Sequence, residues 1–108
     1  MDETLIAAMT DIIGNEVHPD EIVLFGSRAR GNARPGSDFD FLVVVPNSEE
    51  ALRHRRQITG NLYRSLASYP VSKDILVYTR GEVEHWGGVS GHVVATGLWE
   101  GRRLYARP

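Results

Sequence analysis

The sequence has no cysteine and no long hydrophobic run. Without cysteine the chain cannot form disulfides or cysteine-ligated metal sites, and this composition is typical of a reducing compartment. No apolar run approaches the ~20 residues that a membrane-spanning helix needs. The acidic start, Met1-Asp2-Glu3, lacks the positively charged region of a signal peptide. We therefore expect a cytoplasmic protein without a membrane partner.

The chain also lacks an excess of charge of one sign. Its 12 Lys and Arg residues are offset by 14 Asp and Glu residues, which gives a net charge of −2. Such a balance provides no general attraction to nucleic acid, so we expect no nucleic-acid partner and no template-directed polymerisation. The 108 residues are enough for one hydrophobic core but too few for a catalytic domain plus a substrate domain. We expect a single domain over 1–108.

What the chain does have is an apolar run, 22–25, that stops at Gly26-Ser27. Glycine lets the backbone turn closely there, and Ser27 is a good N-cap for a helix. A helix that begins at this point would direct backbone N–H groups at an anion such as phosphate, and Arg28 and Arg30 would add cationic donors. By itself, Gly-Ser favours an ordinary strand-to-helix turn, and the residues that follow reverse this interpretation.

Two aspartates then open the next apolar run. In an extended strand Asp38 and Asp40 share one face, ~7 Å apart at Cα, and Phe39 and Phe41 share the other. Carboxylates so spaced can converge on one ion or bridge two ions ~3.5–4 Å apart. The alternative is a solvated turn at Ser37-Asp38, which the central character of the following run, 41–45, disfavours.

A third carboxylate, Asp74, lies in another β-favouring run over 71–78. If this strand lies beside the strand of Asp40, Asp74 can complete a three-carboxylate cluster and accept the proton of an attacking hydroxyl. Taken alone, Asp74 fits an edge or surface residue equally well.

These motifs resemble the DNA polymerase beta superfamily of nucleotidyltransferases. The resemblance rests on Gly26-Ser27-x-Ala29-Arg30-Gly31, on Ser37-Asp38-x-Asp40 and on a later strand with Asp74. The small size and the Ala-Arg-Gly version of the motif resemble the minimal nucleotidyltransferases (MNT), the antitoxin-type members that are paired with HEPN-domain toxins. The resemblance covers roughly 21–105.

The resemblance implies transfer of a nucleoside monophosphate, AMP from ATP, to a hydroxyl of a HEPN-domain partner. It implies Mg²⁺, as two ions that Mn²⁺ can replace. The implied nucleotide-binding residues are Gly26, Ser27, Arg30 and Ser37, and the implied catalytic and metal-binding residues are Asp38, Asp40 and Asp74. Two alternatives remain: a small-molecule nucleotidyltransferase, such as one acting on an aminoglycoside, and an antitoxin that only covers its partner. The sequence leaves the oligomeric state undetermined, and both a homo-oligomer and a hetero-oligomer are compatible with it.

The predicted fold class is α/β (α+β), the nucleotidyltransferase fold. We expect a mixed sheet of at least three strands, with helices on one face and the metal site on the other. Helices are predicted over 3–15 and from a cap at Ser48 to Tyr69, with His54 packed on the second one. We expect a turn over 79–81 and a last strand over 103–105. Of Trp86 and Trp99, one is predicted in the core and one at an interface.

Overall fold

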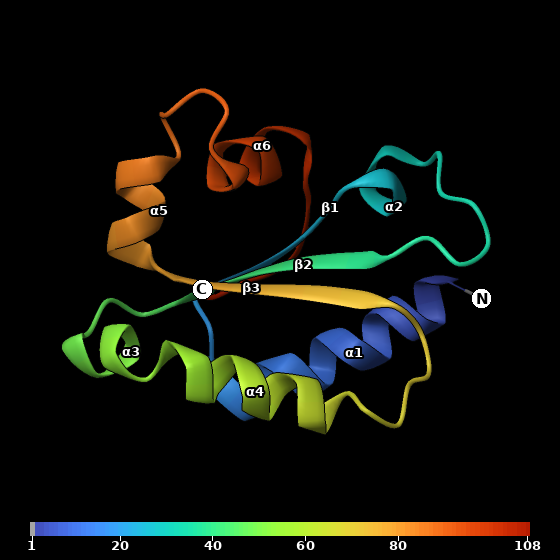
Figure 1. Cartoon of the computed structure of the whole chain (residues 1–108), viewed down its shortest axis with the longest axis horizontal. Helices are drawn as coiled ribbons and strands as arrows, with labels where there is room; N and C mark the ends of the chain where they lie inside the picture. Colours follow the sequence, from blue (N-terminus) through green and yellow to red (C-terminus); the bar gives the residue numbers. More distant parts are fainter. Residues whose placement is uncertain (1) are drawn as a thin grey trace.

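A computed structural model describes residues 2–108, whose strands form one four-stranded sheet in the order β3-β2-β1-β4 (Figure 1). The strands are β1 (Glu21–Phe25), β2 (Phe39–Val45), β3 (Lys73–Thr79) and β4 (Arg102–Ala106). β1 runs antiparallel to both β2 and β4, whereas β2 and β3 are parallel. The sheet is therefore mixed, and the predicted α+β fold class is confirmed.

Six helices connect and cover these strands. They are α1 (Asp2–Val17), α2 (Ser27–Arg30), α3 (Glu49–Arg53), α4 (Arg55–Ser65), α5 (Arg80–Trp86) and α6 (Val93–Glu100). Across the part of the chain that the structure describes, none of the helices is long and apolar enough to cross a membrane.

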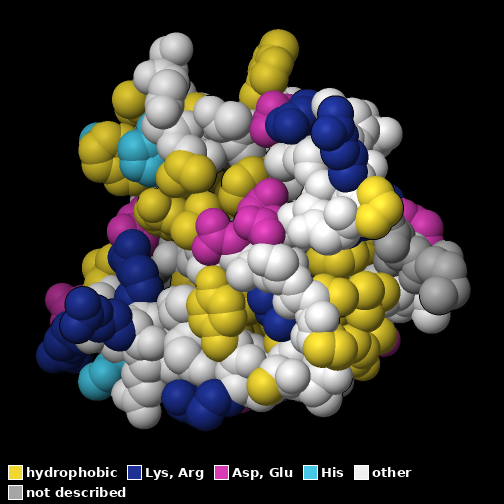
Figure 2. Space-filling view, turned by 45° about the vertical axis from the view of Figure 1, so that its right-hand side comes forward, with side chains coloured by type: hydrophobic (Ala, Val, Ile, Leu, Met, Phe, Trp, Pro, Cys, Tyr) yellow, Lys and Arg dark blue, Asp and Glu magenta, His cyan; other side chains and the backbone are white. Residues whose placement is uncertain are grey.

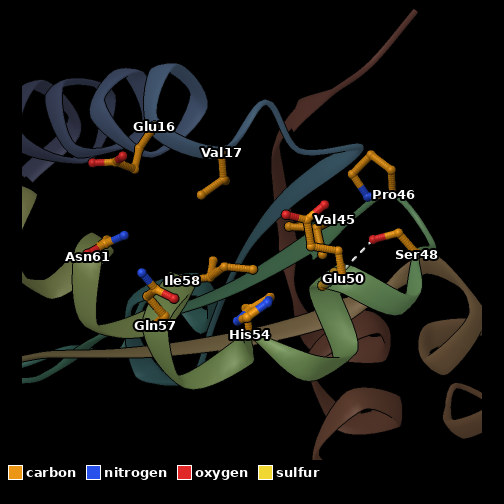
Figure 3. A pocket seen from close by; sticks show the side chains of 11 residues that line it. Glu16, Val17, Val45, Pro46, Ser48, Glu50, His54, Gln57, Ile58 and Asn61 are labelled. Carbon is orange, nitrogen blue, oxygen red and sulfur yellow. Dashed lines mark hydrogen bonds between the residues drawn. The ribbon is translucent and has the colours of Figure 1, made fainter.

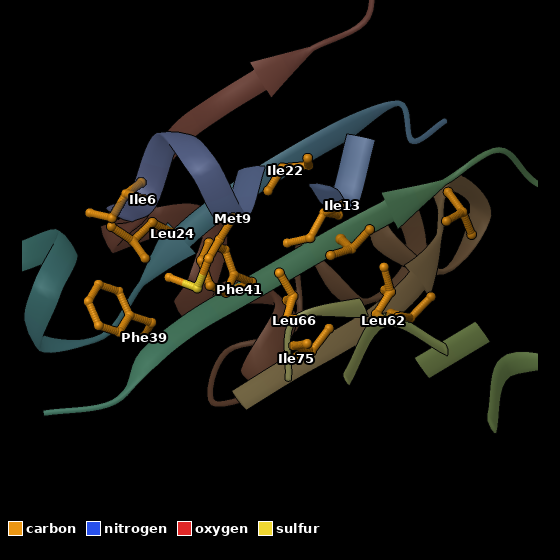
Figure 4. Packing of buried hydrophobic residues seen from close by; sticks show 13 residues of the cluster. Ile6, Met9, Ile13, Ile22, Leu24, Phe39, Phe41, Leu62, Leu66 and Ile75 are labelled. Atoms are coloured by element: carbon orange, nitrogen blue, oxygen red, sulfur yellow. The ribbon is translucent and has the colours of Figure 1, made fainter. Parts of the chain in front are cut away.

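The main hydrophobic core lies between the sheet and the helices α1 and α4 (Figures 1 and 4). Met9 and Ile13 of α1 and Leu62 of α4 are fully buried there, against Phe39 and Phe41 of β2. Strand alternation therefore sends both phenylalanines into this core and leaves Asp40 on the opposite face, as predicted.

A smaller core occupies that opposite face, where α5 and α6 pack on the sheet (Figure 1). Val83 of α5 and Val94 of α6 are buried against Leu42 and Val44 of β2. Helices therefore cover both faces, and the expectation of helices on one face alone holds only for the long helices α1 and α4. The reason is that Leu42 and Val44 give β2 a second apolar face, which α5 and α6 cover. The turn expected at 79–81 is instead the start of α5.

The segment predicted as one helix from Ser48 to Tyr69 is divided at His54 into α3 and α4. The Ser48 hydroxyl accepts a hydrogen bond from Ala51 N–H, which confirms the predicted N-cap. His54 is exposed and has a φ of −110°, so the expectation that it packs on the helix's apolar face was wrong. The break turns it away from the core.

Candidate active site

Asp40 and Asp74 are brought together by the parallel pairing of β2 with β3. The register places Asp40 opposite Asp74, so their side chains leave neighbouring strands on the same face of the sheet. This is the adjacency that the sequence prediction required. It creates a pair of carboxylates at the N-terminal ends of two parallel strands, on the face that also carries α5 and α6.

Asp38 directly precedes β2 and is tied to the residue that precedes β3. The Ser72 hydroxyl donates to Asp38 Oδ1, and Phe39 N–H donates to the Ser72 carbonyl at 2.9 Å. At the other end of the group, the Tyr63 hydroxyl contacts Asp74 Oδ1 at 3.3 Å. The two outer carboxylates are thus each held by a hydroxyl, with Asp40 between them.

The electrostatics of Asp40 show that the three carboxylates affect one another. Partial burial raises the pKa of Asp40, and the charges of Asp38 and Asp74 raise it further. Arg30 opposes this shift, because its positive charge lowers the pKa of the same carboxyl. A bound cation would relieve the repulsion that this arrangement creates.

The Gly26-Ser27 turn lies directly against Asp40. Gly26 has φ 74° and ψ −160°, and a Cβ placed on it would lie 2.2 Å from Asp40 Oδ2. Gly26, and not Ser27 as predicted, is the N-cap residue, because the backbone enters the helical conformation one residue early. Ala29 and Arg30 N–H both donate to the Gly26 carbonyl. The backbone N–H groups of Ala29 and Arg30 are therefore occupied within the helix, whereas the amide of Ser27 is at the start of the helix, where it could donate to a phosphate.

The other predicted nucleotide-binding residues have internal partners. Arg30 Nη1 lies 3.1 Å from Glu100 Oε1, and its side chain remains 45 % exposed. The Ser37 hydroxyl accepts from Arg34 N–H at 2.9 Å, and the Ser37 carbonyl accepts from the Arg28 guanidinium. That guanidinium also lies 4.0 Å from the centre of the Phe39 ring. Arg28 and Ser37 therefore shape the loop between α2 and β2, whereas Arg30 stands at the rim of the site.

Oxygen ligands of this kind suit Mg²⁺, but the site is not a closed metal cage. Within residues 2–108 no three Asp, Glu, His or Cys side chains converge on one position that an ion could occupy. Mg²⁺ needs no such cage, since it is commonly bound through one or two carboxylates, substrate phosphates and water. The residues fit an ion that arrives with a nucleotide, with Asp40 as the central ligand. The predicted three-aspartate ligand set stays a prediction.

A cleft with a volume of about 500 Å³ lies away from the aspartates, where α1 faces α3 and α4 (Figure 3). Its floor includes Val17, Val45 and Ile58, and Glu16 and Glu50 stand at its rim. None of the three aspartates lines it. On the surface seen in Figure 2, acidic side chains lie beside hydrophobic ones.

Two contacts of the site were missed by the sequence reasoning: Ser72 on Asp38 and Tyr63 on Asp74. Ser72 lies two residues before Asp74, and its position could have been inferred once β3 was placed beside β2. Tyr63 had no comparable signal, because it comes from α4 and reaches the site only through tertiary packing.

Comparisons with known proteins identify the family and the fold. The family model described as "Nucleotidyltransferase domain" matches residues 8–90. A crystal structure described as a toxin-antitoxin with AMP-PNP shares the fold, with a TM-score of 0.54 and 19 % sequence identity. The similarity covers 94 % of this chain and 73 % of the other. None of the curated proteins matches the chain.

Proposed function

The chain belongs to the nucleotidyltransferase domain family, and we propose that it transfers AMP from ATP to a hydroxyl of a partner protein. The proposed biological role is that of the antitoxin in a HEPN/MNT toxin-antitoxin pair. The observation that carries the proposal is the pairing of Asp40 with Asp74, with the Gly26-Ser27 turn against Asp40. The similarity in fold to a toxin-antitoxin crystallised with an ATP analogue supports the same proposal.

The proposal assigns a task to each of the predicted site residues. Gly26 lets the backbone approach the triphosphate, Ser27 donates hydrogen bonds to it, and Arg30 exchanges Glu100 for a phosphate. Ser37 holds the loop that leads to the aspartates.

Asp38, Asp40 and Asp74 would hold the divalent ions, which would supply charge neutralisation and alignment of the phosphates. Asp74 also accepts the proton of the attacking hydroxyl. The acceptor oxygen forms a bond to the α-phosphorus of ATP as the bond from that phosphorus to the bridging oxygen breaks, and pyrophosphate leaves.

The acceptor is expected to come from another molecule. On the aspartate face, the described residues 2–108 place the short helices α2, α5 and α6 (Figure 1). A transferase needs its acceptor hydroxyl within about 3.5 Å of the reacting phosphorus. A protein surface that brings a tyrosine or serine to Asp74 would supply it.

Nucleotide binding is the first part of the test. Titration calorimetry with ATP should show binding that requires Mg²⁺ or Mn²⁺, and that is weakened by Ser27→Ala and by Arg30→Ala. ATP binding of equal strength with and without metal would contradict the assignment of the aspartates.

Covalent transfer is the second part. The purified chain and its HEPN-domain partner are incubated with ATP and Mg²⁺, and the partner is weighed by intact-mass spectrometry. The expected result is a mass gain of one or more adenylyl groups with the wild type and none with Asp38→Asn or Asp40→Asn. A partner of unchanged mass, inhibited equally by wild type and Asp38→Asn, would establish an antitoxin that acts by covering its partner.

A further inference from the structure

Tyr63 extends from α4, on the face of the sheet with the main core, to the aspartates on the opposite face. Its hydroxyl contacts Asp74 on β3. β3 is one of the two edge strands of the sheet, and among the described residues it pairs with β2 alone. Ile75 N–H donates to the Tyr63 hydroxyl at 2.9 Å, so the phenol caps an outward-facing N–H of that edge.

The two contacts fix the direction of the hydrogen bonds. A phenol carries one proton, and its oxygen accepts from Ile75 N–H. Its own proton is therefore available to Asp74 Oδ1, 3.3 Å away. That distance is longer than the ~2.8 Å usual between a hydroxyl and an oxygen acceptor, and such contacts commonly shorten when substrate assembles the site.

We infer that Tyr63 is a positioning residue that holds the Asp74 carboxylate by Oδ1, so that the other oxygen faces the divalent ion and the acceptor hydroxyl. This inference rests on the proposed function, since it assigns Tyr63 a task within the same site. Ser72 makes the corresponding contact with Asp38 Oδ1. Hydrogen-bond partners behind metal ligands fix the orientation of those ligands in the same way.

The test replaces Tyr63 with Phe, which removes only the hydroxyl. The matched control is Tyr105→Phe, because Tyr105 lies on β4 at the other edge of the sheet and has a similar exposure, 39 % against 37 %. Mn²⁺ affinity is measured by titration in the presence of a non-hydrolysable ATP analogue. We expect Tyr63→Phe to weaken Mn²⁺ binding by about 10- to 100-fold, and Tyr105→Phe to leave it unchanged.

Two further readouts separate positioning from general loss of structure. In turnover at saturating metal, Tyr63→Phe should lower kcat by a similar factor and leave KM for ATP near the wild-type value, and a cooperative thermal melt should show that the fold is retained. In the Asp74→Asn background, Tyr63→Phe should have no further effect on Mn²⁺ affinity, because its effect is exerted through that carboxylate.

Unchanged Mn²⁺ affinity and kcat in Tyr63→Phe, or equal losses in Tyr105→Phe, would overturn the inference. So would a gain of one adenylyl group on the chain itself that Tyr63→Phe abolishes, because Tyr63 would then be an acceptor. Failure of the proposed function gives a different result: the wild type itself would bind neither Mn²⁺ nor the ATP analogue.

Discussion

Gly26 shows how closely one residue can constrain the site. Its φ of 74° and ψ of −160° lie in a region that is essentially restricted to glycine. The position of Asp40 Oδ2 leaves no room for a Cβ. Glycine is therefore required twice, once by the backbone and once by the carboxylate.

Gly26→Ala should cost about 1–3 kcal/mol of unfolding free energy through backbone strain and displace the Asp40 carboxylate. Urea denaturation measures the first effect, and Mn²⁺ titration with an ATP analogue measures the second. Gly14→Ala is the matched control, because Gly14 lies inside α1 with no atom near a new Cβ. It should stabilise the protein by up to about 1 kcal/mol. Equal stability of the two variants would contradict the prediction that Gly26→Ala strains the backbone.

Asp40 gives a pH-dependent prediction. Its pKa is raised in the folded protein by burial and by Asp38 and Asp74. The folded state therefore favours the protonated form, and in the absence of metal the ionised carboxylate destabilises the fold once the pH exceeds that raised pKa. At pH 7 without metal, Asp40→Asn should melt at the same temperature as the wild type or higher.

As the pH falls through the raised pKa toward the ordinary value of 3.8, the wild type regains this stability and any advantage of Asp40→Asn should disappear. Mg²⁺ with ATP should raise the melting temperature of the wild type more than that of the variant. Asp11→Asn, the same charge change on the exposed side of α1, controls for net charge. A collapse of Asp40→Asn at pH 7 would make Asp40 structural.

At the scale of the elements, α1 and the strands were predictable because their apolar residues recur with helical or alternating period. The same alternation placed Phe39 and Asp40 on opposite faces. The prediction of a single helix from Ser48 to Tyr69 failed because nothing in the sequence marks the break. His54 ends α3 and begins α4, and its side chain does not cap α4.

The start of α5 was missed for a different reason. Thr79 closes β3 and caps α5 at the same time, so strand and helix share a residue where a turn was expected. Its hydroxyl accepts from Glu82 N–H at 3.2 Å, and Glu82 Oε1 accepts from Thr79 N–H at 2.9 Å. The Thr-x-x-Glu spacing was the available signal. Contacts such as Tyr63 with Asp74 were beyond prediction, because they depend on how α4 packs against the β3 edge.

This cap sets the stability of α5. Thr79→Ala should lower the free energy of unfolding by about 1 kcal/mol for the lost cap, with a further loss because the residue is buried. Thr79→Ser retains the hydroxyl and isolates the contribution of the methyl group. Urea denaturation of the two variants measures the difference. If Thr79→Ala and Thr79→Ser were equally stable, the capping box would contribute nothing.

At the scale of the whole molecule, exposed hydrophobic side chains gather near one side of the site. Val89, Val93, Leu98 and Trp99 are each at least 36 % exposed, and Trp99 is 92 % exposed. The neighbouring Glu100 forms an ion pair with Arg30. The end of α6 is thereby joined to the rim of the candidate site. Trp86, in contrast, packs against the smaller core and stacks on His92, which agrees with the prediction of one tryptophan inside.

Under the proposed function, we expect Trp99 to contact the partner protein, because a large exposed indole beside the ion pair of Glu100 with Arg30 gains most from burial in an interface. Trp99→Ala should leave the melting temperature and ATP binding unchanged, since Trp99 makes little contact with the fold. It should weaken binding of the HEPN-domain partner about 30-fold, as expected for a loss of about 2 kcal/mol. Titration of the partner measures the change.

Leu52→Ala, on α3 and 47 % exposed, is the control that should bind normally. Wild-type partner binding by Trp99→Ala would place the interface elsewhere on the molecule, whereas equal losses in both variants would indicate a general effect of surface hydrophobicity.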